Sequence, residues 1–297
     1  MKHERVIAVW NTFGARNNFG SMLIFLAELE ATTNNFKIVD VACIGLNNNP
    51  SLFLSVMRFF SRVNNILFFS DQSEFAKYSS HLETEHWLNI VDNFKLSSCN
   101  ESTLFLQNIY KANKDSRRLN IPEYLRPEVD LWLNKYCDGY KPVVVHLKNN
   151  PNDLQSNANF ESWSNFFLHV LNKKYKVKFI LIGNDEIDKR VSNLSNVIVT
   201  KENGGNTELD IALVLSAFLF LGMSSGPCNA AIFSDVPYII WKHPEHHAEE
   251  MNRELKDNNS FTSNPLMSSY VLYEICKVDN RFINGRGAML GLNNDEF

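Results

Sequence analysis

The chain of 297 residues lacks the features of a disulfide scaffold, a membrane-spanning protein or a nucleic-acid-binding protein. Its five cysteines are odd in number, far apart and in no CxxC pair, which is typical of reduced cytosolic thiols and not of a zinc site. Its longest apolar tract, residues 211–223, falls short of the roughly 20 residues that a spanning helix needs. A net charge of −4 leaves no basic field for a polyanion, so we expect no nucleic acid as a partner.

The composition that remains is that of a soluble globular protein. Hydrophobic residues make up 44% of the chain and charged residues 21%, which excludes wholesale disorder. The length suits two domains, each able to bury a core. The apolar run 6–10 near the N-terminus is too short for a signal peptide. We therefore expect a cytoplasmic protein.

Strand-like runs alternate with helical patterns in both halves, which is typical of parallel α/β sheets. The expected strands are 5–11, 37–45, 66–69, 142–147, 177–182, 197–200, 219–223 and 238–241, and the clearest helices are 21–29 and 160–171. The pattern predicts an α/β fold of two doubly wound, Rossmann-like domains that face each other across a cleft. We place them at residues 1–140 and 141–280, with 116–140 as the linker. The Gly- and Asn-rich tail, 281–297, has the composition of a disordered segment.

The most informative stretch is 219–241, LFLGMSSGPCNAAIFSDVPYIIW, which indicates a strand, a tight turn, a helix and a second strand. Ser225 suits the N-cap of that helix and Pro227 its first turn. Gly226 would let the backbone come close to a ligand. A phosphate would then lie at the helix N-terminus, at the carboxyl ends of the strands. Thr207 is predicted to cap a second helix, with Asp210 completing a capping box.

Four segments of the second half occur in an ordered set: PVVVHLKNN, KFILIGNDE, NVIVTKENGG and TELDIALVLSAFLFLGMSSGPCNAAIFSDVPYIIW. This set resembles the C-terminal domain of GT-B glycosyltransferases, particularly bacterial heptosyltransferases and related surface-polysaccharide enzymes. The resemblance covers residues 141–245 well and the first half in outline. It implies a metal-independent transfer of a sugar from a nucleotide-diphosphate donor to a carbohydrate or lipid-linked glycan acceptor. The nucleotide sugar would be a co-substrate, with no further cofactor.

We expect the donor-binding residues to come from the loops that follow the strands of the second half. Lys148 can neutralise a departing phosphate, and an acid after a strand can accept hydrogen bonds from a ribose. An ordinary capped turn and a solvated lysine beside a partly buried histidine are the structural alternatives. The residues assigned to the donor are His146, Lys148, Gly183, Glu202, Ser224, Ser225, Gly226 and Asn229.

The loop after the first strand is the candidate acceptor or closing loop, or else a permissive turn. Heptosyltransferase-like proteins carry a Gly-Asp pair at the start of the helix that follows, and that Asp is a candidate base. This chain has Gly20-Ser21 there and no acid between positions 6 and 26, so we assign no catalytic residue. Either the base comes from elsewhere, or the transfer is retaining, or activity has been lost. The residues assigned to this loop are Gly14, Arg16, Asn17, Gly20 and Ser21.

Two other segments have competing interpretations. The His- and Glu-containing run 243–247 is a local cluster without the fixed three or four ligands of a zinc site, so we expect no metal. The apolar, basic segment 53–63 is predicted to be a core helix, with contact to the inner face of a membrane as the alternative. At the level of function, the alternatives are a polysaccharide pyruvyl transferase that uses phosphoenolpyruvate and a non-catalytic binding protein of GT-B-like fold.

Overall fold

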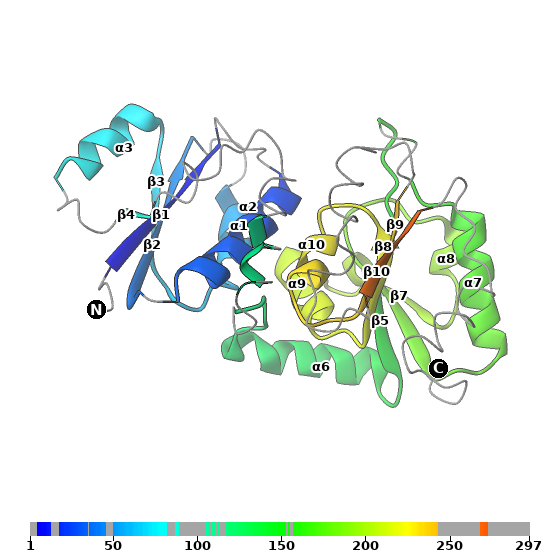
Figure 1. Cartoon of the computed structure of the whole chain (residues 1–297). Helices are drawn as coiled ribbons and strands as arrows, with labels where there is room; N and C mark the ends of the chain where they lie inside the picture. The colour runs from blue at the N-terminus through cyan, green and yellow to red at the C-terminus, as the bar shows by residue number, and fades with distance from the viewer. Residues whose placement is uncertain are drawn as a thin grey trace. The chain divides into compact units, whose positions relative to one another are not determined.

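The computed structural model divides the chain into two compact units, Met1–Pro122 and Glu123–Phe297. Each unit is an α/β fold built on a parallel sheet (Figure 1). Strands and helices alternate along both units, as the sequence predicts. The residues that the structure describes are 5–12, 18–34, 36–45, 50–81, 87–88, 105–106, 108–110, 112, 117–152, 154, 157–242 and 268–272.

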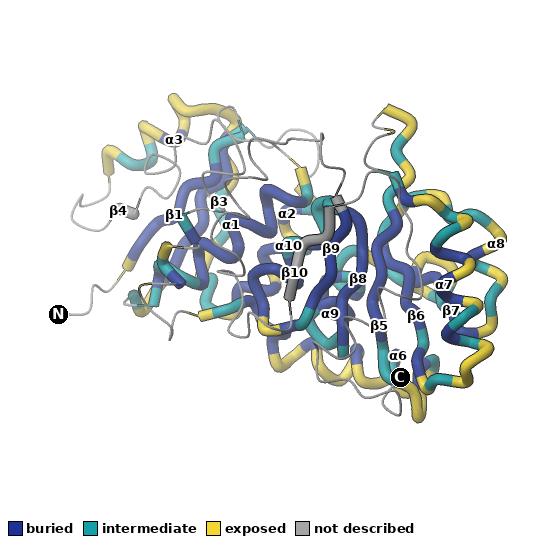
Figure 2. The backbone as a smooth tube through the Cα atoms, turned by 45° about the vertical axis from the view of Figure 1, so that its right-hand side comes forward, coloured by how far each residue is buried: buried dark blue, intermediate teal, exposed yellow. Residues whose placement is uncertain are grey.

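The first unit holds a four-stranded sheet in the order β3-β2-β1-β4, with every pairing parallel. Helices α1 and α2 lie on one face of this sheet and α3 lies on the other (Figures 1 and 2). The elements are β1 (Arg5–Asn11), α1 (Phe19–Thr32), β2 (Ile38–Ile44), α2 (Pro50–Met57), β3 (Val63–Phe69), α3 (Gln72–Ser79) and β4 (Trp87–Leu88).

The apolar, basic segment 53–63 packs into the core of the first unit. Only its first part is helical, because α2 ends at Met57. Phe53, Phe59 and Phe60 are nevertheless all buried. The Arg62 guanidinium donates to the Thr33 carbonyl at 2.9 Å. The interpretation of this segment as part of the core is therefore confirmed for these residues.

The second unit holds a six-stranded parallel sheet in the order β10-β9-β8-β5-β6-β7. From β5, the first of these strands in the chain, the sheet continues through β6 and β7 on one side and through β8, β9 and β10 on the other. This is a doubly wound order, and its direction reverses between β5 and β8. Ligands of such sheets bind at the carboxyl ends of the strands beside that reversal. The elements are η2 (Glu123–Leu125), α6 (Arg126–Cys137), β5 (Lys141–His146), α7 (Phe160–Asn172), β6 (Val177–Leu181), α8 (Lys189–Ser192), β7 (Val197–Val199), η4 (Thr200–Glu202), α9 (Thr207–Leu215), β8 (Leu219–Met223), α10 (Cys228–Ile232), β9 (Tyr238–Lys242) and β10 (Ser268–Leu272).

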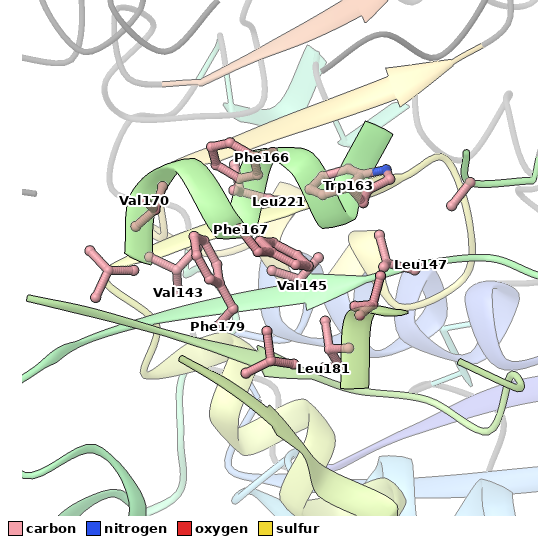
Figure 3. Packing of buried hydrophobic residues seen from close by; sticks show 14 of the residues in the cluster. Val143, Val145, Leu147, Trp163, Phe166, Phe167, Val170, Phe179, Leu181 and Leu221 are labelled. Atoms are coloured by element: carbon pink, nitrogen blue, oxygen red, sulfur yellow. The ribbon is translucent and has the colours of Figure 1, made fainter. Parts of the chain in front are cut away.

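Helices α7 and α8 cover one face of the second sheet, and α9 and α10 cover the other (Figure 1). Trp163 of α7 is fully buried and packs edge-on against Trp241 at 5.1 Å between ring centroids. Val143 and Val145 of β5 belong to this α7-side core (Figure 3). Because side chains alternate along a strand, His146 is directed toward the opposite face, where α9 and α10 lie.

Helix α6 occupies the segment that the sequence predicts to be a linker. It contacts β5 and α9, and the Trp132 indole Nε1 donates to the Asn203 carbonyl at 3.2 Å. Its proline, Pro127, stands in the first turn, where proline is compatible with a helix. The division between the units falls before α6, which therefore belongs to the second unit. Across the described residues, no helix is both long and apolar enough to cross a membrane.

Candidate functional site

The candidate site lies at the carboxyl ends of β5 and β8, where the strand order of the second sheet reverses. His146 is the last residue of β5 and pairs with Gly222 of β8. A Cβ atom on Gly222 would stand 2.8 Å from the His146 carbonyl oxygen, so only glycine fits beside β5 at this point. The close pairing of the two strands brings the turn after β8 up to the imidazole of His146.

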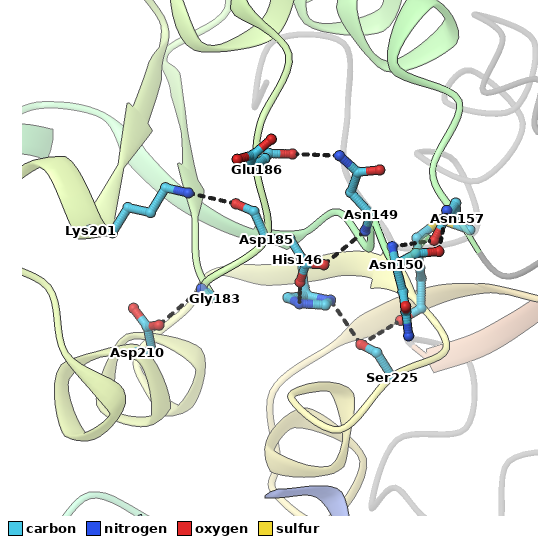
Figure 4. Close-up of polar contacts among 11 residues, drawn as sticks. His146, Asn149, Asn150, Asn157, Gly183, Asp185, Glu186, Lys201, Asp210 and Ser225 are labelled. Carbon is cyan, nitrogen blue, oxygen red and sulfur yellow. Dashed lines mark hydrogen bonds and ion pairs between the residues drawn. The ribbon is translucent and has the colours of Figure 1, made fainter. Parts of the chain in front are cut away.

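Ser225 lies in that turn and bonds to His146 instead of capping the helix. Its Oγ atom is 2.8 Å from His146 Nδ1 and 3.1 Å from the Met223 carbonyl oxygen (Figure 4). The predicted N-cap role of Ser225 is therefore wrong. Helix α10 begins after Pro227, with no side-chain capping bond. Proline at this position has no N–H that needs an acceptor, so the Ser225 hydroxyl is available to the histidine.

Asp185 reaches the other nitrogen of the imidazole from the loop after β6. Its Oδ2 atom lies 3.4 Å from His146 Nε2, and its Oδ1 atom accepts from the Asn149 N–H at 2.9 Å. The hydrogen bond with His146 is the main cause that lowers the pKa of Asp185, so this carboxylate is ionised at neutral pH. Lys201 Nζ donates to the backbone carbonyl of Asp185 at 2.6 Å, which fixes the loop in place (Figure 4).

Gly183 has no side chain, and this leaves space for the imidazole of His146. Its φ angle is +96°, and a Cβ atom there would stand 2.9 Å from His146 Cδ2. The Gly183 N–H donates to Asp210 Oδ2 at 2.9 Å. Burial raises the pKa of Asp210 above its ordinary value, and the Gly183 N–H partly opposes this shift.

Asp210 was predicted to complete a capping box begun by Thr207, and this prediction is wrong. The N-cap of α9 is Asn206, whose side chain accepts from the Leu209 N–H at 2.8 Å. Asparagine is as good a cap as threonine and stands one residue earlier. The Asp210 carboxylate therefore serves the loop after β6 and not its own helix.

The other predicted donor residues lie on the same edge of the sheet. Lys148 is half-buried two residues beyond β5, and its charge contributes to the lowered pKa of Asp185. Glu202 is exposed at the end of η4. Ser224, Gly226 and Asn229 are half-buried in or just after the turn that carries Ser225, where the Asn229 N–H donates to the Gly226 carbonyl at 3.2 Å.

In the first unit, Gly20 and Ser21 occupy the first turn of α1, and both are buried. The Ser21 N–H and hydroxyl both donate to the Asn18 side chain, at 3.0 and 3.1 Å, and Asn18 is the N-cap of that helix. Ser21 thus has a structural role in capping. The remaining predicted loop residues, Gly14, Arg16 and Asn17, lie outside the described residues, as does the His- and Glu-containing run 243–247.

The structure therefore brings together His146, Gly183 and Ser225, which the sequence predicts as donor-binding residues, with Asp185 and Asp210, which it does not predict as such. The signal for Asp185 is its place in the Gly183-Asn184-Asp185 turn, which follows the predicted strand 177–182. The resulting group combines a buried imidazole, a half-buried hydroxyl and two carboxylates, with lysines beside them. Hydroxyl and lysine groups can bind the oxygens of a phosphate, and the imidazole can exchange a proton with the hydroxyl.

No protein-family model and no curated protein sequence matches the chain. Among solved structures, the chain is similar to a glycosyl transferase of family 9 from Veillonella parvula, at 11% identity, with a TM-score of 0.55 over 98% of this chain and 90% of that one. It is similar to E. coli heptosyltransferase WaaC with ADP, at 12% identity and a TM-score of 0.53 over 97% and 100%. It is also similar to E. coli ADP-heptose lps heptosyltransferase II, at 10% identity and a TM-score of 0.56 over 97% and 98%.

At these identities the likeness shows the fold. The chain shares the α/β fold of these glycosyltransferases, and the resemblance inferred from the ordered strand, turn and helix segments is confirmed at that level.

Proposed function

We propose that the chain is a glycosyltransferase that moves a sugar from a nucleoside-diphosphate donor to a carbohydrate acceptor, free or lipid-linked, in the synthesis of a bacterial surface polysaccharide or glycoconjugate. The observation that carries the proposal is the bond between Ser225 and His146 across β8 and β5. This bond lies where the strand order of the second sheet reverses, which is the usual ligand position in doubly wound sheets. The fold that contains it is one that solved glycosyltransferases share.

In this proposal, the second unit binds the donor and the first unit holds the acceptor. The Ser225 hydroxyl donates to a phosphate oxygen of the donor, and Lys148 lies two residues beyond His146 with its charge near the same group. As the bond between sugar and phosphate breaks, negative charge grows on the leaving diphosphate. A fixed positive charge and a hydroxyl donor stabilise that charge more in the transition state than in the ground state. In this proposal, the second unit therefore stabilises the leaving diphosphate.

The proposal is tested by thermal unfolding of the purified chain with UDP, GDP, CDP, ADP, CMP or phosphoenolpyruvate. A ligand at 100 times its Kd stabilises the folded state by about 2.7 kcal/mol, which raises the melting temperature measurably. We expect one nucleoside diphosphate to do so, and Ser225→Trp to abolish the effect by filling its site. Ser195→Trp is the matched control, because Ser195 is exposed and precedes β7, at the amino-end edge of the same sheet.

Each result of this test distinguishes among the candidate functions. Stabilisation by phosphoenolpyruvate alone favours pyruvyl transfer. Stabilisation by a nucleotide without consumption of any nucleotide sugar favours a binding protein, an outcome consistent with the lack of an acid between positions 6 and 26. An absence of stabilisation by every compound contradicts donor binding.

A further inference from the structure

Asp185 determines that Nε2 of His146 carries a hydrogen. Nε2 faces Asp185 Oδ2 at 3.4 Å, and an ionised carboxylate can only accept hydrogen bonds. Nε2 therefore carries a hydrogen whether the imidazole is neutral or protonated. The two forms of His146 then differ only at Nδ1, the nitrogen that faces Ser225.

The form of Nδ1 decides where the single hydroxyl hydrogen of Ser225 points. When His146 is neutral, Nδ1 is an acceptor and the Ser225 hydroxyl donates to it across 2.8 Å. The oxygen lone pairs of Ser225 then face outward, and they repel a phosphate. When His146 is protonated, Nδ1 donates to Oγ and the hydroxyl hydrogen is released. That hydrogen can then go to the Met223 carbonyl, 3.1 Å away, or to a ligand.

We propose that His146 is a positioning residue that takes up a proton when a nucleoside diphosphate binds and thereby turns the Ser225 hydroxyl toward the phosphate. This inference rests on the proposed function, because it requires a diphosphate at Ser225. His146 itself is only 4% exposed and acts through Ser225.

The charges around His146 favour this uptake once the ligand is present. Asp185 from the loop after β6 and Asp210 from α9 both act on His146 electrostatically. Lys148 lies in the loop after β5, and its charge acts on Asp185. Lys201 of η4 donates to the backbone carbonyl of Asp185. Helix α10, which follows Ser225, carries no charged side chain. A bound diphosphate adds negative charge beside the imidazole, and a nearby negative charge favours the protonated form of a histidine.

Isothermal titration calorimetry tests the inference directly. ADP, GDP, UDP and CDP are titrated into the whole chain at one pH in two buffers with different enthalpies of ionisation. The difference between the two observed enthalpies gives the number of protons taken up on binding. We expect uptake by the wild-type chain, and an affinity that falls by up to about tenfold for each unit of rising pH.

His146→Asn is the critical variant, since its side-chain amide still offers Ser225 a partner but cannot titrate. We expect the proton uptake to be lost beyond what the nucleotide phosphates contribute, and the affinity to become nearly independent of pH. Because a substitution at a buried site can impair folding, Asp185→Asn provides a second approach. This variant removes the charge that faces Nε2, so we expect weaker binding at pH 7.5 and recovery at lower pH. Asp188→Asn is its control, because asparagine can still cap α8.

The possible results separate the inference from the proposed function. Nucleotide binding with equal proton uptake by the wild-type chain and folded His146→Asn overturns the inference and leaves donor binding intact. The inference is also overturned if Asp185→Asn and Asp188→Asn change the nucleotide affinity and its pH dependence equally. If none of the four nucleotides binds to the wild-type chain, the proposed function fails and the inference fails with it.

Discussion

The hydroxyl oxygen of Ser225 lies 2.8 Å from Nδ1 of His146, although 79 positions separate the two residues in the chain. The contact joins the ends of two strands that are neighbours only because the second sheet reverses its strand order between them. It therefore reports on the fold and on the candidate site at once.

Ser225→Ala should lower the free energy of unfolding by about 1–3 kcal/mol, because the buried Nδ1 atom of His146 loses its partner. Urea denaturation of the two proteins measures this difference. Ser224→Ala is the matched control in the same turn, since Ser224 bonds to the Trp241 carbonyl through its backbone N–H. Equal losses in the two variants would contradict a specific role for the Ser225 hydroxyl.

Gly183→Ala should be more damaging than the same change at Gly204. Both glycines have positive φ angles, +96° and +78°, and a left-handed conformation costs a non-glycine residue about 1–2 kcal/mol. Only at Gly183 does the new methyl group also meet a side chain, at 2.9 Å from His146 Cδ2, whereas Gly204 has nothing within 4 Å. We expect Gly183→Ala to show a larger drop in melting temperature and to weaken nucleotide binding. Similar drops for both variants would show that backbone strain alone matters.

Asp210 should make stability depend on pH in a defined direction. Burial raises its pKa above the ordinary value of 3.8, so the folded state holds this proton more tightly than the unfolded state. The contribution of Asp210 to stability is therefore greatest below about pH 3.8 and is lost as pH rises through the raised pKa. Asp210→Asn keeps an acceptor for the Gly183 N–H, so we expect it to gain stability relative to the wild-type chain between pH 4 and pH 7.

Asp210→Ala provides the contrast to this prediction. It leaves the Gly183 N–H without an acceptor, and we expect a loss of about 1–3 kcal/mol. Chemical denaturation at pH 4 and at pH 7 measures all three proteins. The account is contradicted if Asp210→Asn loses stability with rising pH as the wild-type chain does.

Trp163→Ala should lower the free energy of unfolding by about 3–5 kcal/mol, since the indole is fully buried between α7 and the second sheet. It packs against Phe166, Phe167 and Trp241, with ring centroids 5.1–6.0 Å away. Leu168→Ala on the same helix is the control, because Leu168 is 36% exposed. Intrinsic fluorescence and urea denaturation report both variants, and comparable losses would contradict the assignment of the core.

Local patterns in the sequence predict the strands of this fold well. The predicted strands 5–11 and 219–223 coincide with β1 and β8, and the predicted helix 160–171 is one residue shorter than α7. A continuous apolar run indicates a buried strand, and an apolar face at helical spacing indicates a buried helix. Both patterns can be recognised in a single sequence.

The prediction is less complete where polar residues sit inside an element. Strand β3 begins at Val63, three residues before the predicted start, because Asn64 and Asn65 interrupt its apolar pattern. Both asparagine amides donate to the buried carboxylate of Asp40 on the neighbouring strand, at 3.0 and 2.9 Å. Such a partner 24 or 25 residues away cannot be read from a local window.

The candidate site is only partly predicted, because its contacts also join residues that are far apart in the sequence. Sequence placed Ser225, His146 and Gly183 at strand ends, where ligands bind in parallel sheets. It assigned Ser225 and Asp210 to helix caps, since capping is the commonest local use of these residue types. The structure instead assigns them to long-range contacts, with His146 and with the Gly183 N–H. These pairings depend on strand order, which one sequence does not specify.

The most direct test of donor binding at this site is a crystal structure of the chain with the nucleoside diphosphate that raises its melting temperature most. We predict a phosphate oxygen within about 3.2 Å of Ser225 Oγ, at the carboxyl ends of β5 and β8. Phosphates bound elsewhere on the second unit, with Ser225 still donating to His146 and touching no ligand, would contradict the account.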